Sequence, residues 1–439
     1  MPNKMRRNEK RHTLWRGTAR FYILKASFLI AYLYSSIVFG QCDFEWKPLN
    51  DNLNDDVYAL TVYKNELIAA GGFTSAAGSD VNRIARFDGN TWHPLANGMN
   101  NFVSTLTVYG GNLIAGGIFT KTDGLDVNRI ASWDGNNWRM LGGGMNSDVY
   151  ALTVYNGELI AGGLFKNAGG VDVNNIARWN GVSWQGLGGG AKGVVYALTV
   201  YNNQLIAGGG FNLVDNNVAN CIASWDGNTW RPLGGGITGT VAYVYSLAIY
   251  KNQLIAGGYF GRAGTTNLNN IASWDGNSWH AFGNGINGNF PYVSALYVYD
   301  GNLFAGGFFT QAGNIDANYI ARWDGSNWYP LGSGINGDGD TAVTSMGTYQ
   351  GELYAGGSFE IAGSIDSNNL AKWGLPQVYA GDLNHDCIVD SFDFGLFAQQ
   401  WLANDCLYNG SCGEADLNYD LSVDFEDFSI LASNWLNGN

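Results

Sequence analysis

Two acidic segments near the C-terminus carry oxygen-bearing side chains at the spacing of a calcium-binding loop. The first begins at Asp382 and the second, 34 residues later, at Asp416. Each offers carboxylate or amide oxygens at positions 1, 3, 5, 9 and 12 and a backbone carbonyl at position 7, which is the ligand set of a twelve-residue calcium loop. The predicted ligands are Asp382, Asn384, Asp386, Ile388, Asp390 and Asp393, then Asp416, Asn418, Asp420, Ser422, Asp424 and Asp427. The sequence therefore predicts two bound calcium ions.

Each acidic loop is followed by a short amphipathic helix that would hold it in place. Apolar residues recur at offsets of 3, 7 and 8, which places them on one helical face. They are Phe394, Phe397, Trp401 and Leu402 in the first copy and Phe428, Leu431, Trp435 and Leu436 in the second. This duplicated loop and helix, from about Gly381 to Leu436, resembles a type I dockerin. The resemblance implies the same calcium ligands and a cohesin-like scaffold protein as partner.

Residues suited to catalysis are few in the rest of the chain. Of the four histidines, His12 lies in the leader, His93 and His280 follow a repeated Trp, and His385 lies in an acidic loop. An Asp in a Trp-Asp-Gly phrase recurs at Asp134, Asp226, Asp275 and Asp324, where it is expected to cap a turn. No catalytic constellation is predicted, and no His cluster could hold copper.

Three long loops are the strongest candidates for ligand binding. They begin at Gly236, Gly285 and Gly334 and connect successive repeats, so we expect them to cluster on one sector of one face. The candidate binding residues on them are Tyr243, Phe290, Tyr292, Asp338 and Asp340. Aromatic residues there could stack on sugar rings or contact a protein. The alternative is that the loops differ in length without any role.

The element that must position these loops is a sevenfold repeat. An Ala-Gly-Gly step is followed by an aromatic residue whose successive spacings are 46, 46, 46, 49, 49 and 50 residues. The third copy predicts strands over 149–155, 158–165, 175–179 and 183–187, with Asn-Gly turns between the first and the last pairs. A period of 40 to 50 made of short strands is typical of a β-propeller. The fold class is therefore mainly β, a seven-bladed β-propeller with a small α-helical, calcium-binding domain after it.

The ring is predicted to close through the N-terminal strand. A second Trp follows the first six repeated aromatics, but none follows Trp373. The missing strand occurs first in the chain, as Phe44–Leu49 with Trp46, so it should complete blade seven and remove two exposed sheet edges. The paired glycines and spaced tryptophans resemble kelch-type propellers of the galactose-oxidase-like kind, over about Phe44 to Gly374.

The N-terminus and the charge indicate export. Residues 1–40 have a basic region and a 14-residue apolar run, as in a secretory signal cleaved before Gln41. The alternative is an uncleaved anchor helix counted from Phe21. Nothing after residue 40 could span a membrane, and the net charge of −14 argues against nucleic acid or an anionic membrane as partner. The predicted domains are the signal at 1–40, the propeller at 41–375 and the dockerin-like domain at 376–439.

Three functions remain open at this point. The first is a secreted or cell-surface calcium-binding protein whose propeller binds a polysaccharide or protein and whose tail docks onto a scaffold. The second is a polysaccharide-active enzyme carried on a dockerin, and the third is a purely structural surface protein. The absence of a unique acid pair among the repeats favours the first. Two of Cys387, Cys406 and Cys412 are expected to form a disulfide, but the spacing does not decide which.

Overall fold

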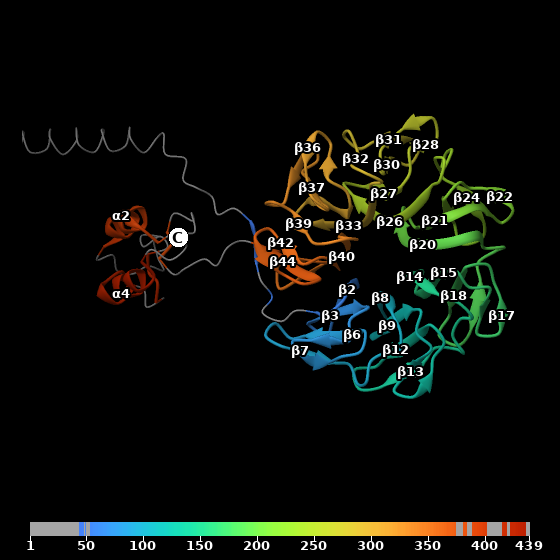
Figure 1. Cartoon of the computed structure of the whole chain (residues 1–439), viewed down its shortest axis with the longest axis horizontal. Coiled ribbons are helices and arrows are strands. Elements are labelled where there is room, and N and C mark those ends of the chain that lie inside the picture. Colours follow the sequence, from blue (N-terminus) through green and yellow to red (C-terminus); the bar gives the residue numbers. More distant parts are fainter. Residues whose placement is uncertain are drawn as a thin grey trace, which may run out of the picture. The chain divides into compact units, whose positions relative to one another are not determined.

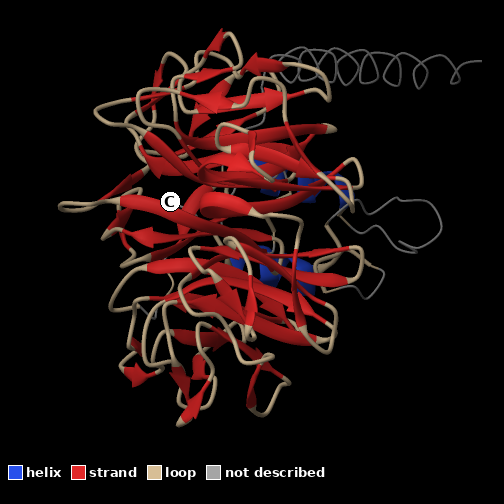
Figure 2. Ribbon diagram, turned by 90° about the vertical axis from the view of Figure 1, so that its right-hand side faces the viewer, coloured by secondary structure: helices blue, strands red, loops and turns tan. Residues whose placement is uncertain are grey.

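The structure is a computed structural model that describes residues 44–47, 49, 53–374, 381–383, 389–401, 415–418 and 422–435. The described chain consists of strands and loops apart from two helices (Figure 2). It divides into two compact units, with residues 44–374 in one and the described C-terminal residues in the other. Among the described residues, no helix is long and apolar enough to cross a bilayer.

Residues 44–374 form a ring of seven sheets, each with a four-stranded core, which is a β-propeller (Figure 1). We number the blades in chain order, so that blade 1 begins with β2. The inner strands lie around the central axis and contact their neighbours on both sides. They are β2 (Val57–Tyr63), β8 (Val103–Tyr109), β14 (Val149–Tyr155), β20 (Ala191–Tyr201), β26 (Tyr243–Tyr250), β33 (Tyr292–Tyr299) and β40 (Ala342–Tyr349).

The next two strands of each blade pair antiparallel with their predecessors. The second strands are β3 (Glu66–Gly71), β9 (Asn112–Gly117), β15 (Glu158–Gly163), β21 (Gln204–Val214), β27 (Gln253–Tyr259), β34 (Asn302–Phe308) and β41 (Glu352–Ser358). The third strands are β6 (Ile84–Phe87), β12 (Ile130–Trp133), β18 (Ile176–Trp179), β23 (Ile222–Trp225), β30 (Ile271–Trp274), β37 (Ile320–Trp323) and β44 (Leu370–Gly374).

The outer strand of each blade carries the second Trp of the repeat. In chain order these strands are β1 (Glu45–Lys47), β7 (Trp92–Pro94), β13 (Trp138–Met140), β19 (Trp184–Gly186), β24 (Trp230–Pro232), β31 (Trp279–Ala281) and β38 (Trp328–Pro330). β1 pairs with β44, with Trp46 opposite Trp373, so the first strand of the chain completes blade seven as the sequence predicts.

Short two-residue strands between the second and third strands were not predicted from the sequence. They are β4 (Ser75–Ala76), β5 (Ser79–Asp80), β10 (Lys121–Thr122), β11 (Leu125–Asp126), β16 (Asn167–Ala168), β17 (Val171–Asp172), β22 (Asn217–Val218), β28 (Arg262–Ala263), β29 (Thr266–Asn267), β35 (Gln311–Ala312), β36 (Ile315–Asp316), β42 (Ile361–Ala362) and β43 (Ile365–Asp366). We call each of these pairs an outer hairpin. In blades 5 to 7 a third strand from the preceding loop joins it, namely β25 (Ile237–Thr238), β32 (Ile286–Asn287) and β39 (Ile335–Asn336).

The core of the propeller lies between the blades. Seven apolar clusters each combine side chains of neighbouring blades. The cluster that joins blade 7 to blade 1 contains Leu49, Val57 and Tyr354, all buried. The inner strands are less covered than their apolar sequence predicts, because they line the axis: Val154 in β14 is 37% exposed.

The described tail contains two helices, α2 (Ser391–Gln400) and α4 (Phe425–Ser433). Their shared core is Val389, Phe397, Ala415, Val423 and Leu431. Phe397 and Leu431 come from the predicted apolar faces, whereas Phe394 and Trp435 are 44% and 43% exposed. Leu402 and Leu436 lie outside the described residues.

Candidate functional site

Every inner strand contains a β-bulge near its start, on the face of the ring where the second strands end. In blade 3 the register skips one residue between Val149 and Ala151, so Tyr150 has no partner on β15. A bulge redirects the side chain of the extra residue. The bulged residues are Tyr58, Ser104, Tyr150, Tyr196, Tyr245, Ser294 and Thr344.

The second glycine of each repeat allows this bulge. A Cβ atom on Gly163 would lie 2.0 Å from the carbonyl oxygen of Asp148, the residue before the bulged strand segment. That same carbonyl accepts a hydrogen bond of 2.9 Å from the amide of Leu164. The two strands therefore approach too closely for any side chain at position 163.

The bulged tyrosines of blades 3, 4 and 5 touch one another. The ring centroids of Tyr150 and Tyr196 are 5.5 Å apart, and those of Tyr196 and Tyr245 are 5.3 Å apart. Tyr243 stacks on Tyr245 at 5.7 Å, and Tyr292 of blade 6 lies 5.9 Å from Tyr245. We call these five residues the axial tyrosine cluster. All five are half-buried.

Blades 5 and 6 extend the cluster with Tyr259 and Phe308, at a position where the other repeats have no aromatic residue. Tyr243 pairs across the strands with Tyr259, and Tyr292 pairs with Phe308, whose rings stack at 5.8 Å. The residue at the position of Tyr259 is Gly72 in blade 1 and Leu164 in blade 3. Since repeated residues build the ring, these departures from the repeat distinguish one sector of it.

Two tyrosines of the cluster, Tyr150 and Tyr245, remain neutral at physiological pH. Burial raises the pKa of Tyr245 to about 12, with the neighbouring tyrosines adding to the effect. Burial and the hydrogen bond of 3.0 Å that the Tyr150 hydroxyl donates to Asp148 raise the pKa of Tyr150 to about 12. The surface therefore presents uncharged rings with hydroxyl groups at their edges.

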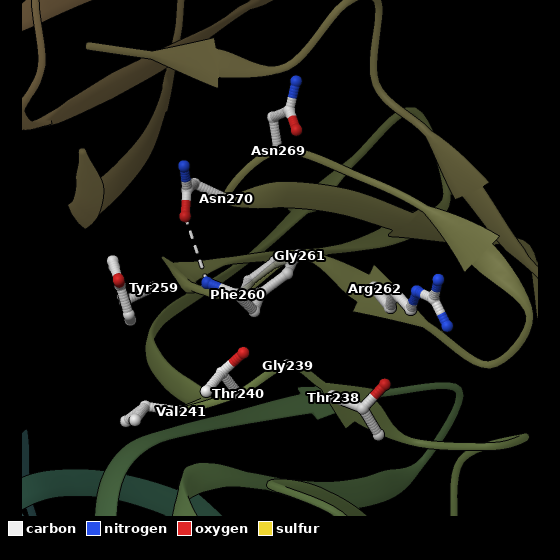
Figure 3. Close-up of a pocket in the computed structure, with 10 residues that line it drawn as sticks. All are labelled: Thr238, Gly239, Thr240, Val241, Tyr259, Phe260, Gly261, Arg262, Asn269 and Asn270. Atoms are coloured by element: carbon white, nitrogen blue, oxygen red, sulfur yellow. Dashed lines mark hydrogen bonds between the residues drawn. The ribbon is translucent and has the colours of Figure 1, made fainter. Parts of the chain in front are cut away.

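A pocket of about 760 Å³ adjoins the cluster in blade 5 (Figure 3). It is lined by Thr238, Gly239, Thr240, Val241, Tyr259, Phe260, Gly261, Arg262, Asn269 and Asn270. Tyr259 lies at one end of this lining in Figure 3 and Arg262 at the other. The buried side chain of Asn270 accepts a hydrogen bond from the amide of Phe260 at 3.0 Å, which fixes the wall between them.

The five candidate loop residues lie in different environments. Tyr243 and Tyr292 belong to the axial tyrosine cluster. Phe290 is 73% exposed at a backbone φ of 54°. Asp338 and Asp340 are exposed, and burial together with the charge of Asp340 raises the pKa of Tyr292. The sequence analysis missed Tyr150, Tyr196, Tyr245, Tyr259 and Phe308. Aligning the repeats column by column would have singled out Tyr259 and Phe308.

The repeated aspartates cap turns, as predicted. Asp134 accepts hydrogen bonds of 2.8 and 2.9 Å from the amides of Asn136 and Asn137, which together with Arg139 lower its pKa to about 2. His280 lies 2.7 Å from Asp275 on the exposed surface. These groups stabilise outer-strand turns.

The described part of the acidic loops has the same geometry in both copies. Asp393 accepts hydrogen bonds from the amides of Leu383 (2.7 Å) and Asp390 (2.8 Å). Asp427 accepts the equivalent bonds from Leu417 (2.7 Å) and Asp424 (2.9 Å). Asp390 and Asp424 cap the two helices within capping boxes. Asp393 and Asp427 are fully buried, and Asp382 is 4% exposed.

Several predicted ligands, namely Asn384, Asp386, Ile388 and Asp420, lie outside the described residues, as do Cys387, Cys406, Cys412 and the leader. Asp416, Asn418 and Ser422 are described and lie in the second loop. In the part of the chain that the structure describes, no group of three or more His, Cys, Asp or Glu side chains is arranged to hold a metal ion.

Comparison with known proteins gives a short family match. A family model described as a domain of unknown function (DUF5122) beta-propeller matches residues 65–90, from the turn before β3 to the turn after β6 in blade 1. No curated protein matches the chain.

Three similar solved structures illustrate the range of likeness. The extracellular domain of a hybrid two component system from B. thetaiotaomicron has 11% identity and a TM-score of 0.48, over 77% of this chain and 40% of that one. The WD40 beta propeller domain of Doa1 has 13% identity and a TM-score of 0.47, over 75% and 96%. The computationally designed Ika8 protein has 16% identity and a TM-score of 0.44, over 74% and 98%. This chain thus spans less than half the length of the first of them.

Proposed function

We propose that this chain is an exported binding protein. Its kelch-like propeller binds a polysaccharide on the axial tyrosine cluster, and its dockerin-like tail folds around two calcium ions and docks onto a cohesin-like scaffold at the cell surface. The observation that carries the proposal is the contact of four consecutive inner strands through tyrosine rings, from Tyr150 to Tyr292.

The chemistry of the cluster suits sugars. A tyrosine has a large apolar ring and a polar edge, so it can pack against the C–H face of a sugar while its hydroxyl bonds to the sugar's hydroxyl groups. The adjoining pocket supplies Thr238, Thr240 and Asn269 as further polar partners. Its volume lies in the range of small-ligand sites, which favours a few sugar units over a protein surface.

The tail supports calcium binding through the position of its carboxylates. Two carboxylates, Asp393 and Asp427, are fully buried at the last position of the two loops, where each accepts hydrogen bonds from two backbone amides of its own loop. A carboxylate at this position is a ligand in a twelve-residue calcium loop. The bond from Leu383 to Asp393 brings the second and last positions of the first loop together, so the start and the end of the loop lie close to each other. The leader and the excess of acidic residues favour export.

The test of the sugar site replaces tyrosines by a residue that the repeat itself uses. Ser occupies the bulge in blades 2 and 6, so Tyr196→Ser and Tyr245→Ser should keep the fold. We expect both variants to lose retardation in affinity electrophoresis through gels of soluble glucan, xylan, mannan or pectin. Tyr329→Ala, on the outer strand β38, is the matched control and should migrate like the wild type. The proposal fails if no polysaccharide retards the wild type. It also fails if both Ser variants are retarded as strongly as the wild type.

A further inference from the structure

Two outer hairpins lack the aspartate that the other five share: blade 4 pairs Leu213 with Val218, and blade 5 pairs Arg262 with Asn267. In each hairpin the first residue of the first strand lies opposite the last residue of the second strand. This last residue is an aspartate in five blades, namely Asp80, Asp126, Asp172, Asp316 and Asp366. In blade 5 it is Asn267, which faces Arg262.

In the blade 2 hairpin the aspartate forms an ion pair with a basic residue at this position. Lys121 occupies the place of Arg262, and its ammonium lies 2.6 Å from the carboxylate of Asp126. Because Asn267 replaces the aspartate, Arg262 has a charge that no described residue neutralises by an ion pair. Arg262 is exposed and lines the pocket that begins at Tyr259.

We propose that the blade 5 pocket is a subsite for the carboxylate of an acidic sugar, a uronate unit in the polysaccharide. This inference rests on the proposed function and adds the ligand class. A guanidinium binds a carboxylate through two parallel hydrogen bonds, which a neutral sugar cannot form. One uronate ring stacks on Tyr259 or its neighbours, and the next carboxylate along the chain reaches Arg262.

The dimensions of the site agree with this assignment. Tyr259 and Arg262 are three residues apart with a bend at Gly261 between them, so they are separated by at most about 10 Å, which is within the length of a disaccharide. The residues between them, Phe260 and Gly261, also line the pocket and lie between Tyr259 and Arg262 in Figure 3. Thr238 faces Arg262 across β25 and β28 and can bond to ring hydroxyl groups. The pocket should therefore prefer sugars that carry a free carboxylate, whereas the neutral tyrosine surface beside it should not.

The test compares oligogalacturonate with its methyl ester, which has the same sugar rings but no carboxylate charge, by calorimetry on the full chain. We expect the free acid to bind the wild type about 10- to 100-fold more tightly than the ester, the range of a charge-assisted hydrogen-bond pair. Asn267→Asp gives Arg262 the facing carboxylate that Lys121 has in blade 2, and should abolish this preference while Arg262 stays in place. Arg262→Gln should do the same. Lys121→Gln is the matched control and should retain the preference.

The outcomes separate the two proposals. If acid and ester bind the wild type equally and Tyr245→Ser weakens both, the carboxylate subsite is wrong and the sugar-binding surface stands. A preference for the acid that survives Asn267→Asp also overturns the subsite. If neither compound binds and no polysaccharide retards the chain, both proposals fail. Melting temperatures within error of the wild type are expected for all three variants, because Lys121, Arg262 and Asn267 are exposed.

Discussion

The indole Nε1 of Trp46 donates a hydrogen bond of 2.9 Å to the carbonyl oxygen of Leu331, 285 residues later in the chain. The same bond joins Trp138 to Leu95 and Trp184 to Leu141, always from the outer strand of one blade to the preceding blade. The chain's first strand is therefore held to blade 6 by the contact that joins ordinary neighbours. Lys47 and Lys372 add ion pairs of 2.7 and 2.9 Å to Glu352 within blade 7.

Removing this closure should destabilise the whole ring. Trp46 is 4% exposed, so Trp46→Ala should lower the free energy of unfolding by about 3–5 kcal/mol, the usual cost of truncating a buried tryptophan. Deleting Phe44–Leu49 should lower the melting temperature further and cause association through the open edge. A monomeric elution profile and an unchanged melt for the deletion would contradict ring closure through β1.

The hydrogen bond can be separated from the packing by a matched pair. Trp92 is as buried as Trp46, but its indole nitrogen has no hydrogen-bond partner among the described residues. Trp46→Phe and Trp92→Phe remove similar ring area, and only the first removes a bond. We expect Trp46→Phe to cost about 1 kcal/mol more in urea unfolding. Equal costs would show that the bond to Leu331 adds nothing.

The two glycines of each repeat should respond differently to alanine. A Cβ on Gly163 meets a backbone carbonyl at 2.0 Å, which cannot move without breaking the bulge. A Cβ on Gly162 meets side-chain atoms of the next blade, Val195 at 2.6 Å and Leu198 at 3.2 Å, and blade 1 already has Ala70 at this position. We expect Gly163→Ala to cost about 3 kcal/mol and Gly162→Ala about 1 kcal/mol in urea unfolding. The reverse order would mean that contact between blades, and not the bulge, limits the repeat.

The tail should depend on calcium and the propeller should not. Asp382→Ala together with Asp416→Ala removes the first ligand of each loop. The full chain should bind two calcium ions by calorimetry, and the double variant should bind none. A chelator should remove the helical signal of α2 and α4, because calcium binds only to their folded loops, while the main melting transition of the propeller stays unchanged. An identical helical signal with and without chelator would show that the apolar core around Phe397 and Leu431 suffices.

The sequence predicted the ring well because the ring is made of repeated local signals. The strand at Val149–Tyr155 was predicted to the residue, and the closing strand followed from one missing Trp. The second strand was predicted to reach Phe165 but ends at Gly163, since Leu164 leaves the ladder to bond to Asp148.

The candidate site was predicted only in part, because it depends on how strands meet. A bulge depends on the close approach of a carbonyl on one strand to a glycine on the next. The residue types alone do not predict this approach. Tyr245 occupies a repeated position, so a structural role would be predicted for it from the sequence. In the structure its ring contacts those of three other tyrosines. Tyr243 and Tyr292 were predicted as loop residues because of the unusual length of the segments before them, although they are the first residues of β26 and β33. The predicted ligands between 384 and 388 lie outside the described residues, so they remain predictions.

The buried tyrosines should make the propeller sensitive to alkaline pH. The pKa of Tyr150 and of Tyr245 is raised to about 12 in the folded chain, whereas an unfolded chain ionises its tyrosines near about 10. The folded state therefore binds more protons than the unfolded state between these values. Stability is complete below about pH 10 and falls as the pH rises toward 12.

Ultraviolet titration of the phenolate groups checks this. The native chain should leave a fraction of its tyrosines un-ionised above the pH at which the chain in denaturant has ionised all of them. Tyr150→Ser and Tyr245→Ser should each reduce that late fraction. If all tyrosines of the folded protein ionise reversibly near pH 10, the rings are not packed together, and the surface proposed to bind sugar does not exist in this form.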